Sequence, residues 1–369
     1  MPSLSLTEFL TLIPKAELHY HLLGGVRLAT MQALAEKYHV ELSDEQAQSY
    51  YRAYQTSGKP RKGGIQALTF LYQLMKEPED YHRVVLEVAE DAAAVGLRYI
   101  ETFWNPSDTP IEYQTLNQTL IQAADQAQQD FGVTIRLIPS INREKSPEEA
   151  VKMVNMVIAH PHPYVLGIGI DYKEQNASVE KFWRAYQLAR KHGLKLTAHC
   201  SEFGLHWRNV QAGIELIGCD RIDHGYTIVE NETLCQAYAY CGVPFTVIPS
   251  NTYYLSQWPE HRTWQQNHPI RKMARAGLNI VPGTDDWHIH NTNSAKCYQV
   301  LVEDFGFDLD GIRQMIINSI EASWSSIDWQ QQQKQLWLKE FDSLRKQLVS
   351  EPIIPQEMHT PYKRKVSGE

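Results

Sequence analysis

The sequence predicts an α/β protein: a (β/α)8 TIM barrel with a helical insertion after strand 1 and extra C-terminal helices. Short runs rich in Val, Ile and Leu recur along the 369 residues, each followed by an amphipathic stretch. This alternation is typical of parallel strands joined by crossover helices. Five of the runs follow a glycine that marks the end of a helix: Gly96, Gly132, Gly193, Gly242 and Gly277. A doubly wound open sheet is the structural alternative.

Eight strands can be assigned from these runs. In chain order they are expected at Glu17–His21, Leu97–Trp104, Val133–Ile141, Val165–Asp171, Leu194–Cys200, Arg221–His224, Pro244–Pro249 and Leu278–Thr284. Polar residues stand at the ends of several of them. In a barrel of this kind the active site lies at the carboxyl ends of the strands, so these polar residues are the candidates for function.

The composition argues against several classes of protein. The chain has 35 Lys and Arg against 43 Asp and Glu, a net charge of −8, and its basic residues are scattered. Because this leaves no electrostatic footprint for a nucleic acid or an anionic membrane, a small-molecule partner is expected. No basic leader or membrane-length apolar segment occurs, which predicts a cytoplasmic protein. The five cysteines are dispersed and suit free thiols.

An alternating histidine pair, His19 and His21, ends the first expected strand. Residues two apart on a strand face the same side, so the two imidazoles form half of a metal site. Further candidates each follow a short apolar run downstream: His199, Glu202, His224, Asp285 and Asp286. Adjacent carboxylates repel each other unless a cation compensates them, which favours metal binding by Asp285 over a helix cap.

Four segments together resemble the adenosine deaminase family, the metal-dependent aminohydrolases of the adenosine and AMP deaminase group in the amidohydrolase superfamily. They occur in the family's order, and the resemblance extends from Pro14 to about Asp286. The segments are Pro14–Leu22 with its His-x-His, Thr197–Glu202 with its His-x-x-Glu, Arg221–Gly225 and Thr284–Asp286. Gly96–Glu101 also resembles the family's second strand.

The resemblance implies one divalent ion per chain, zinc or a similar metal, with catalytic groups around it. The implied ligands are His19, His21, His199 and Asp285. The residual positive charge of such an ion brings the pKa of bound water close to neutrality. His224 and Asp285 would orient or deprotonate that water. A protonated Glu202 would donate to the ring nitrogen beside the attacked carbon, and Asp286 would accept a hydrogen bond from the imidazole half of a purine.

The implied activity is zinc-dependent hydrolytic deamination of an aminopurine nucleoside or a related purine, with release of ammonia. Leu23 stands where family members commonly carry an acidic residue that can hold the ribose hydroxyl. Tyr172 stands where the family has a Gly-containing segment that contacts the purine edge. Ser250 lies in Ile248–Asn251, which resembles the family's seventh-strand Pro-x-Ser-Asn motif with altered neighbours. These three candidate substrate contacts depart from the family pattern, so the expected substrates include 5′-modified adenosines and purines other than adenosine. The sequence predicts no oligomeric state.

Two other functions remain open. The same ion and water could hydrolyse a different C–N or ester bond, or the barrel could bind without catalysis, which the complete set of candidate residues disfavours. Binuclear relatives use a carboxylated lysine on the fourth strand. Here Val165–Asp171 has no lysine, although Lys173 follows, which favours one metal. His288 and His290 form a second His-x-His, interpreted as loop residues near the site.

We expect residues 1–350 to form a single metal-dependent hydrolase barrel domain. A helical insertion at about 28–94 would sit beside the active face, either as a lid or as a packed layer without functional motion. Residues 351–369 are expected to form a polar C-terminal tail, loosely held from Tyr362 onward.

Overall fold

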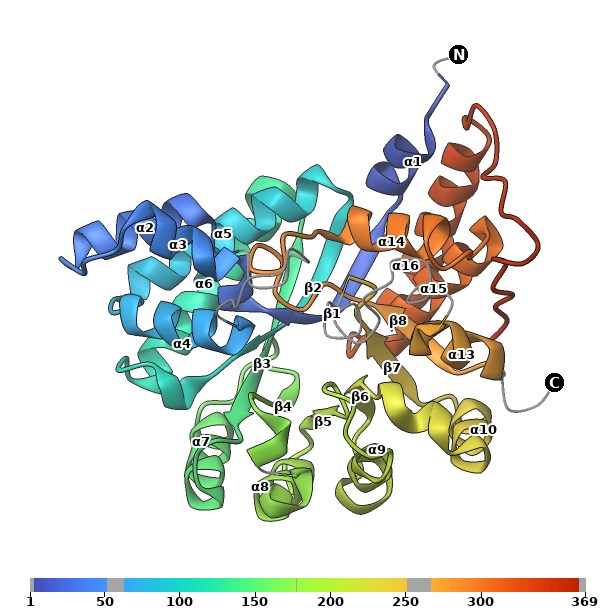
Figure 1. Cartoon of the computed structure of the whole chain (residues 1–369). Coiled ribbons are helices and arrows are strands. Elements are labelled where there is room, and N and C mark those ends of the chain that lie inside the picture. Colours follow the sequence, from blue (N-terminus) through green and yellow to red (C-terminus); the bar gives the residue numbers. More distant parts are fainter. Residues whose placement is uncertain (1–2, 52–62, 177, 251–266, 365–369) are drawn as a thin grey trace.

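Eight parallel strands form the centre of the protein, and their spatial order follows the chain from β1 to β8 (Figure 1). The computed structural model describes residues 3–51, 63–176, 178–250 and 267–364. The strands are β1 Lys15–His21, β2 Leu97–Trp104, β3 Thr134–Asn142, β4 Gly167–Asp171, β5 Lys195–Cys200, β6 Arg221–His224, β7 Pro244–Val247 and β8 Asn279–Pro282. The predicted (β/α)8 barrel is confirmed.

Helices surround the strands in the view of Figure 1. The α-helices are α1 Leu6–Leu12, α2 Leu28–Lys37, α3 Asp44–Tyr51, α4 Gly64–Leu74, α5 Pro78–Ala94, α6 Tyr113–Phe131, α7 Pro147–Ala159, α8 Trp183–Lys191, α9 Arg208–Gln211, α10 Glu232–Cys241, α13 Pro269–Ala276, α14 Ser294–Glu303, α15 Leu309–Ala322 and α16 Ile327–Arg345. Local sequence sets their ends: α7 begins at a Ser146–Glu149 capping box, and α6 ends at Gly132 with φ of 69°. In the described ranges, no helix has both the length and the apolar character that crossing a lipid bilayer requires.

The barrel closes at a seam between β8 and β1. Tyr20 and Asp285 form a parallel bridge there. The His21 N–H donates to the Asp285 carbonyl at 2.9 Å, and the Asp285 N–H donates to the His19 carbonyl at 3.2 Å. Closure therefore sets Asp285 directly beside the two histidines of β1.

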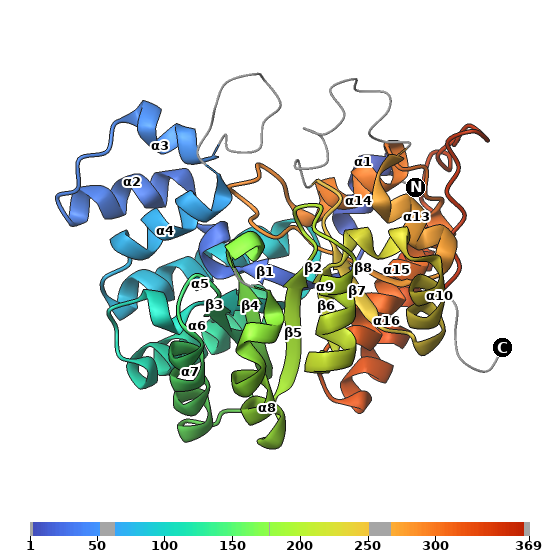
Figure 2. The ribbon, with the colours of Figure 1, turned by 60° about the horizontal axis from the view of Figure 1, so that its bottom comes forward.

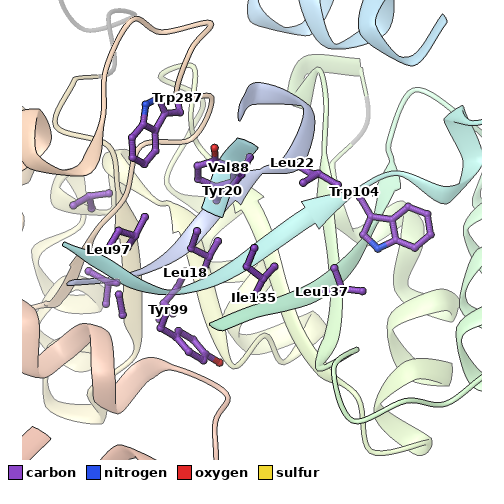
Figure 3. Close-up of a cluster of buried hydrophobic side chains, with 14 of the residues drawn as sticks. Leu18, Tyr20, Leu22, Val88, Leu97, Tyr99, Trp104, Ile135, Leu137 and Trp287 are labelled. Atoms are coloured by element: carbon purple, nitrogen blue, oxygen red, sulfur yellow. The ribbon is translucent and has the colours of Figure 1, made fainter. Parts of the chain in front are cut away.

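Strand β1 separates its polar from its apolar side chains. His19 and His21 face the barrel interior, where the His19 ring packs 4.6 Å from the ring of His199 on β5. Leu18 and Tyr20 alternate with them and enter the apolar layer between barrel and helices, where Tyr20 lies beside Val88 of α5 (Figure 3). The two-residue period of a strand thus directs imidazoles to one side and core residues to the other.

The helical insertion after strand 1 is confirmed as α2 to α5, although its residues 52–62 lie outside the described ranges. Helices α2, α3 and α4 gather at one side of the barrel (Figure 2). Tyr51 donates from its hydroxyl to the Val26 carbonyl at 2.8 Å, and the Tyr72 hydroxyl lies 3.1 Å from Asn105 Oδ1 at the end of β2. These contacts tie the insertion to the rim of the barrel.

All eight strands lie where the sequence predicts, with shifted ends. β2 and β6 have the predicted bounds. β4 begins at Gly167, because Val165 makes only an isolated bridge to Leu137 of β3. β7 ends at Val247, ahead of Pro249, which has no N–H to donate to a neighbouring strand.

The C-terminal segment packs against the barrel as far as it is described. Arg271 Nε donates to Thr360 Oγ1 at 2.8 Å, and Thr360 is buried. The Tyr362 hydroxyl donates to the Leu278 carbonyl at 2.9 Å and accepts from the Ile280 N–H at 3.0 Å. The expectation of a loosely held chain is therefore wrong at Tyr362, because this side chain satisfies backbone groups at the start of β8. Residues 365–369 lie outside the described ranges.

Candidate metal centre

Four side chains converge at the carboxyl end of the barrel. His19 and His21 come from β1, His199 from β5, and Asp285 from the turn after β8. One ligand atom from each residue lies within 4.8 Å of the ligand atoms of the other three, and all four residues are buried. The structure therefore brings together the whole ligand set that the sequence implies.

The spacing of these atoms fits a single cation. His21 Nε2 lies 3.2 Å from both His199 Nε2 and Asp285 Oδ1, and His19 Nε2 lies 3.4 Å from Asp285 Oδ1. Tetrahedral ligands at about 2.0–2.1 Å from zinc stand about 3.3–3.4 Å apart. Buried His19 Nε2 also has no hydrogen-bond partner among the described residues. Such an atom is costly unless something binds it, so it indicates a ligand position.

A carboxylate behind the ligands holds two of the imidazoles. Asp223 of β6 places Oδ2 3.4 Å from Nδ1 of His199 and Oδ1 3.7 Å from Nδ1 of His19. The Thr246 hydroxyl of β7 donates to Asp223 Oδ1 at 2.8 Å, so it accepts from His19 Nδ1 at 2.9 Å. A proton on Nδ1 leaves the Nε2 lone pair of His19 facing the cation position.

Backbone strain is concentrated at this face of the barrel. Four strand-end residues have left-handed backbone: Tyr172 (φ 69°), Ser201 (57°), His224 (67°) and Asp285 (67°). Non-glycine residues rarely adopt this conformation, which costs on the order of 1–3 kcal/mol. At His224 the strain has a visible effect. Consecutive strand residues normally face opposite sides, but here Asp223 and His224 both face the metal ligands.

An acid and a base stand next to the ligands. Glu202 Oε2 lies 3.6 Å from His224 Nε2. Burial, together with the charges of Asp285 and Glu174, raises the pKa of Glu202 well above its ordinary value. Burial and the nearby His19 lower the pKa of His224 well below the ordinary value. Both shifts favour the uncharged forms, a protonated Glu202 carboxyl beside a neutral His224 imidazole.

Two adjacent carboxylates dominate the electrostatics of the site. Burial and the neighbouring Asp285 raise the pKa of Asp286 to about 8. Burial alone would lower the pKa of His21, but a hydrogen bond to Asp285 and the charges of Asp286 and Asp171 raise it to about 10. In the absence of a bound cation, His21 therefore carries a proton that a metal ion would displace.

A small cavity of about 30 Å³ borders the ligands. It is lined by His21, Ile65, Leu68, Asp171, Tyr172, His199, Glu202, Phe203, Asp285 and Asp286. Ile65 and Phe203 also line a neighbouring groove of about 490 Å³ along α4. The cavity is small for a purine ring, and Ile65 and Phe203 stand between it and the larger groove.

The four predicted substrate contacts lie in different surroundings. Asp286 and Tyr172 line the cavity. Leu23 is only 1% exposed and packs in the hydrophobic core, and it is not among the described residues that line the cavity. Ser250 Oγ lies 3.5 Å from Cys297 Sγ, also outside the lining. Asn251 of the same predicted motif lies outside the described residues.

The second histidine pair divides between two places. His290 is buried, and its Nε2 lies 3.5 Å from Asp286 Oδ2. His288 Nε2 lies 2.9 Å from Asp91 Oδ2 on α5, which ties the loop after β8 to the helical insertion. His290 thus lies within the site, whereas His288 lies outside it and holds the loop against α5.

Three imidazoles and a carboxylate at the carboxyl ends of a (β/α)8 barrel, with an acid and a base beside them, define a metal-dependent hydrolase of the amidohydrolase type. Residues 14–337 match the family model described as adenosine deaminase. The chain belongs to the adenosine deaminase family of hydrolytic deaminases.

Relatives agree with this assignment. The chain is 28% identical over 328 residues to an adenosine deaminase of Clostridium kluyveri, covering 88% of this chain and 93% of the relative. It is 28% identical to an adenine deaminase of Marinomonas sp., covering 92% and 99%. Among solved structures, an amidohydrolase from Burkholderia ambifaria with bound zinc has a TM-score of 0.88 and 40% identity, covering 92% and 93%. The adenine deaminase of Arthrobacter aurescens has a TM-score of 0.79 and 26% identity, covering 90% and 99%.

Sequence reasoning did not assign roles to the residues that support and cover the site. No role is predicted for Asp223 within the Arg221–Gly225 segment, although an acid at the end of an apolar strand is a signal for a buried partner. Ile65, Leu68 and Phe203 cover the cavity from α4 and the turn after β5. Nothing in their own segments distinguishes them from ordinary core residues.

Proposed function

We propose that this protein is a zinc-dependent deaminase of a 6-aminopurine, which it hydrolyses with release of ammonia. One arrangement carries the proposal: the uncharged Glu202 carboxyl lines the cavity beside the ligand cluster, and the His224 imidazole stands next to it. The zinc bound in the Burkholderia ambifaria relative supports that metal. A cytoplasmic location stays a prediction from the sequence.

The ligand set would be His19, His21, His199 and Asp285, and a divalent ion held there supplies a Lewis acid that makes water nucleophilic near neutral pH. The other residues then divide the proton transfers. His224 is uncharged, and its buried Nε2 has no hydrogen-bond partner among the described residues, so it can take a proton. Asp285 shares the task of orienting the water.

Glu202 supplies the proton that the purine needs. Burial and neighbouring carboxylates raise its pKa, which favours the protonated form that can donate. Donation to the ring nitrogen beside the amine-bearing carbon makes that carbon electrophilic. Asp286, on the same cavity wall, would hydrogen-bond the imidazole half of the ring.

The surroundings of Leu23 bear on substrate choice. Leu23 lies in the apolar core and cannot accept a hydrogen bond from a ribose hydroxyl. Tyr172 narrows the cavity from the β4 side. The adjoining groove beyond Ile65 and Phe203 offers space for a substituent on the ring. We therefore rank adenine and 5′-modified adenosines above adenosine as substrates. Relatives named for adenosine and for adenine are equally similar to this chain, so they do not decide the question.

Ammonia release from the zinc-loaded protein tests the proposal. The panel is adenine, adenosine, deoxyadenosine, adenosine monophosphate and 5′-modified adenosines, with Glu202→Gln as the control. We expect turnover that falls by about a hundredfold to ten-thousandfold in Glu202→Gln, because the glutamine cannot donate the proton. No turnover across the panel would contradict the proposal and favour hydrolysis of another C–N or ester bond, for which ring protonation is not needed.

A further inference from the structure

The turn after β5 links a metal ligand to the proposed acid. His199 lies on the strand, and Glu202 follows three residues later. Between them the chain turns through Ser201, whose φ of 57° is unfavourable for any residue other than glycine. The direction of the Glu202 side chain therefore depends on a backbone conformation that the residues themselves do not favour.

A buried carboxylate from another loop grips this turn. Glu174, in the short helix η3 (Glu174–Asn176) after β4, is 3% exposed. Its Oε1 accepts the Ser201 N–H at 2.5 Å, and its Oε2 accepts the Glu202 N–H at 3.0 Å. Oε1 also accepts from Asn209 Nδ2 at 3.1 Å. Charge-assisted bonds of this kind are about twice as strong as neutral ones.

A buried cation binds the strand end just before the turn. Arg143, just after β3, donates from Nη2 to the His199 carbonyl at 2.7 Å and is 1% exposed. The Cys200 carbonyl accepts the Gly225 N–H at 2.8 Å. The turn is thus fixed by three neighbouring loops, and Glu174 is the group that binds its two N–H donors.

We propose that Glu174 is a positioning residue for deamination, holding the strained 201–202 turn so that the Glu202 carboxyl faces the cavity and His224. This inference rests on the proposed function. Glu174 lies behind the turn, outside the cavity lining, and acts through the backbone of Glu202. An acid that is misplaced by about 1 Å can lose about a hundredfold in rate, even though the chemical group is still present.

Glu174→Gln tests the idea, because it keeps the size of the side chain but turns one acceptor into an N–H donor that faces a backbone N–H. We expect kcat to fall about tenfold to a hundredfold, with KM and zinc content within about twofold of wild type. Glu112→Gln is the matched control. Glu112 accepts the N–H groups of Gln114 and Thr115 at 2.9 and 2.8 Å, but at the exposed start of α6. Its kcat should stay at the wild-type value.

A double-mutant cycle separates positioning from general damage. In the Glu202→Gln background, adding Glu174→Gln should change the residual rate by less than about twofold, because the group that it positions is already absent. An equal loss in both backgrounds would overturn the proposal. If Glu174→Gln fails to fold, Glu174→Asp takes its place, since it keeps the charge but is too short to reach both N–H groups.

Amide hydrogen exchange gives a readout that does not depend on activity. Exchange at Ser201 and Glu202 should accelerate in Glu174→Gln and stay unchanged in Glu112→Gln. Unchanged exchange, or an unchanged kcat in an active enzyme, would show that Glu174 does not hold the turn. A wild-type protein that is silent on every purine would instead overturn the proposed function, while the exchange result would still report on the turn.

Discussion

The two ends of the barrel both bury charged side chains, but they balance the charges differently. Toward the amino end, Arg221 Nη1 of β6 lies 2.7 Å from Glu101 Oε2 of β2, and both side chains are fully buried. Glu101 Oε1 accepts the Trp324 N–H at 2.6 Å and the Tyr99 hydroxyl at 2.9 Å. The chain supplies its own counterion there.

At the carboxyl end, the buried carboxylates lack a permanently charged counterion among the described residues. Asp285 and Asp286 are buried, and within the described residues their ion-pair partners are histidines alone. Histidine can give up its proton, whereas arginine cannot. One end of the barrel is therefore built for stability, while the other keeps a place for an external cation.

Removing the ligand at the seam should have the largest effect. We expect Asp285→Ala to bind well under one equivalent of zinc and to lose activity on the order of a thousandfold or more, because the carboxylate both binds the ion and orients water. Metal analysis and ammonia release measure this. Asp310→Ala, at an exposed position on α15, is the control. Full zinc content in Asp285→Ala would show that the carboxyl end does not need this carboxylate to hold a cation.

Breaking the pair at the amino end should affect folding instead. Arg221→Met leaves the Glu101 carboxylate buried without its partner, so we expect about 3–5 kcal/mol less stability in urea unfolding. Activity per folded molecule should fall less than in the ligand variant, because neither residue borders the cavity and Arg221 reaches the site only through Asp223, whose Oδ1 lies 4.0 Å from Arg221 Nε. The double variant Arg221→Met with Glu101→Gln should recover part of the loss. A large fall in kcat at wild-type stability would contradict this assignment.

Asp223 lies between the amino and carboxyl ends of the barrel, behind the candidate metal ligands. Asp223→Asn keeps the shape of the side chain but weakens its hold on His19 and His199. We expect zinc affinity to fall about tenfold to a hundredfold, as for other residues behind metal ligands. Competition with a chromophoric chelator measures the affinity. A value within twofold of wild type would mean that the ligands are held without this carboxylate.

The last prediction concerns pH and the stability of the metal-free protein. After chelation, His21 has a pKa raised to about 10, and burial raises that of Glu17 to about 8. In each case the folded state binds more protons than the unfolded chain, so stability should fall as pH rises from 6 to 10, with a slope of up to about 1.4 kcal/mol per pH unit for each group. Urea unfolding of chelated protein measures the slope. The zinc-loaded protein should show a shallower slope, since the ion replaces the proton on His21; equal slopes would argue against that exchange.

The strands and the cluster of candidate ligands were predictable because their signals are local. His19 and His21 show the two-residue period of a strand, and Asp285 follows an apolar run directly. The supports were not predictable in this way. Glu174 meets the 201–202 turn only because β4 and β5 are neighbours in the barrel, and its sequence surroundings resemble a solvated loop.

Residues whose role depends on distant packing also escaped prediction. Tyr362 looks like part of a polar tail, yet its hydroxyl completes the hydrogen bonding of Leu278 and Ile280. Leu23 is a predicted substrate contact because it stands where family members carry an acidic residue, and the structure places its side chain in the core. In both cases tertiary contacts, which no local pattern encodes, decide the surroundings of the side chain.

The seam between β8 and β1 has a consequence for biosynthesis. A ribosome makes His19 and His21 early, whereas Asp285 emerges only after all eight strands have left the exit tunnel. A nascent chain that stops before β8 holds three imidazoles but lacks both the carboxylate and the backbone bonds that bring it beside β1. Tight capture of the ion therefore coincides with the joining of the last strand to the first.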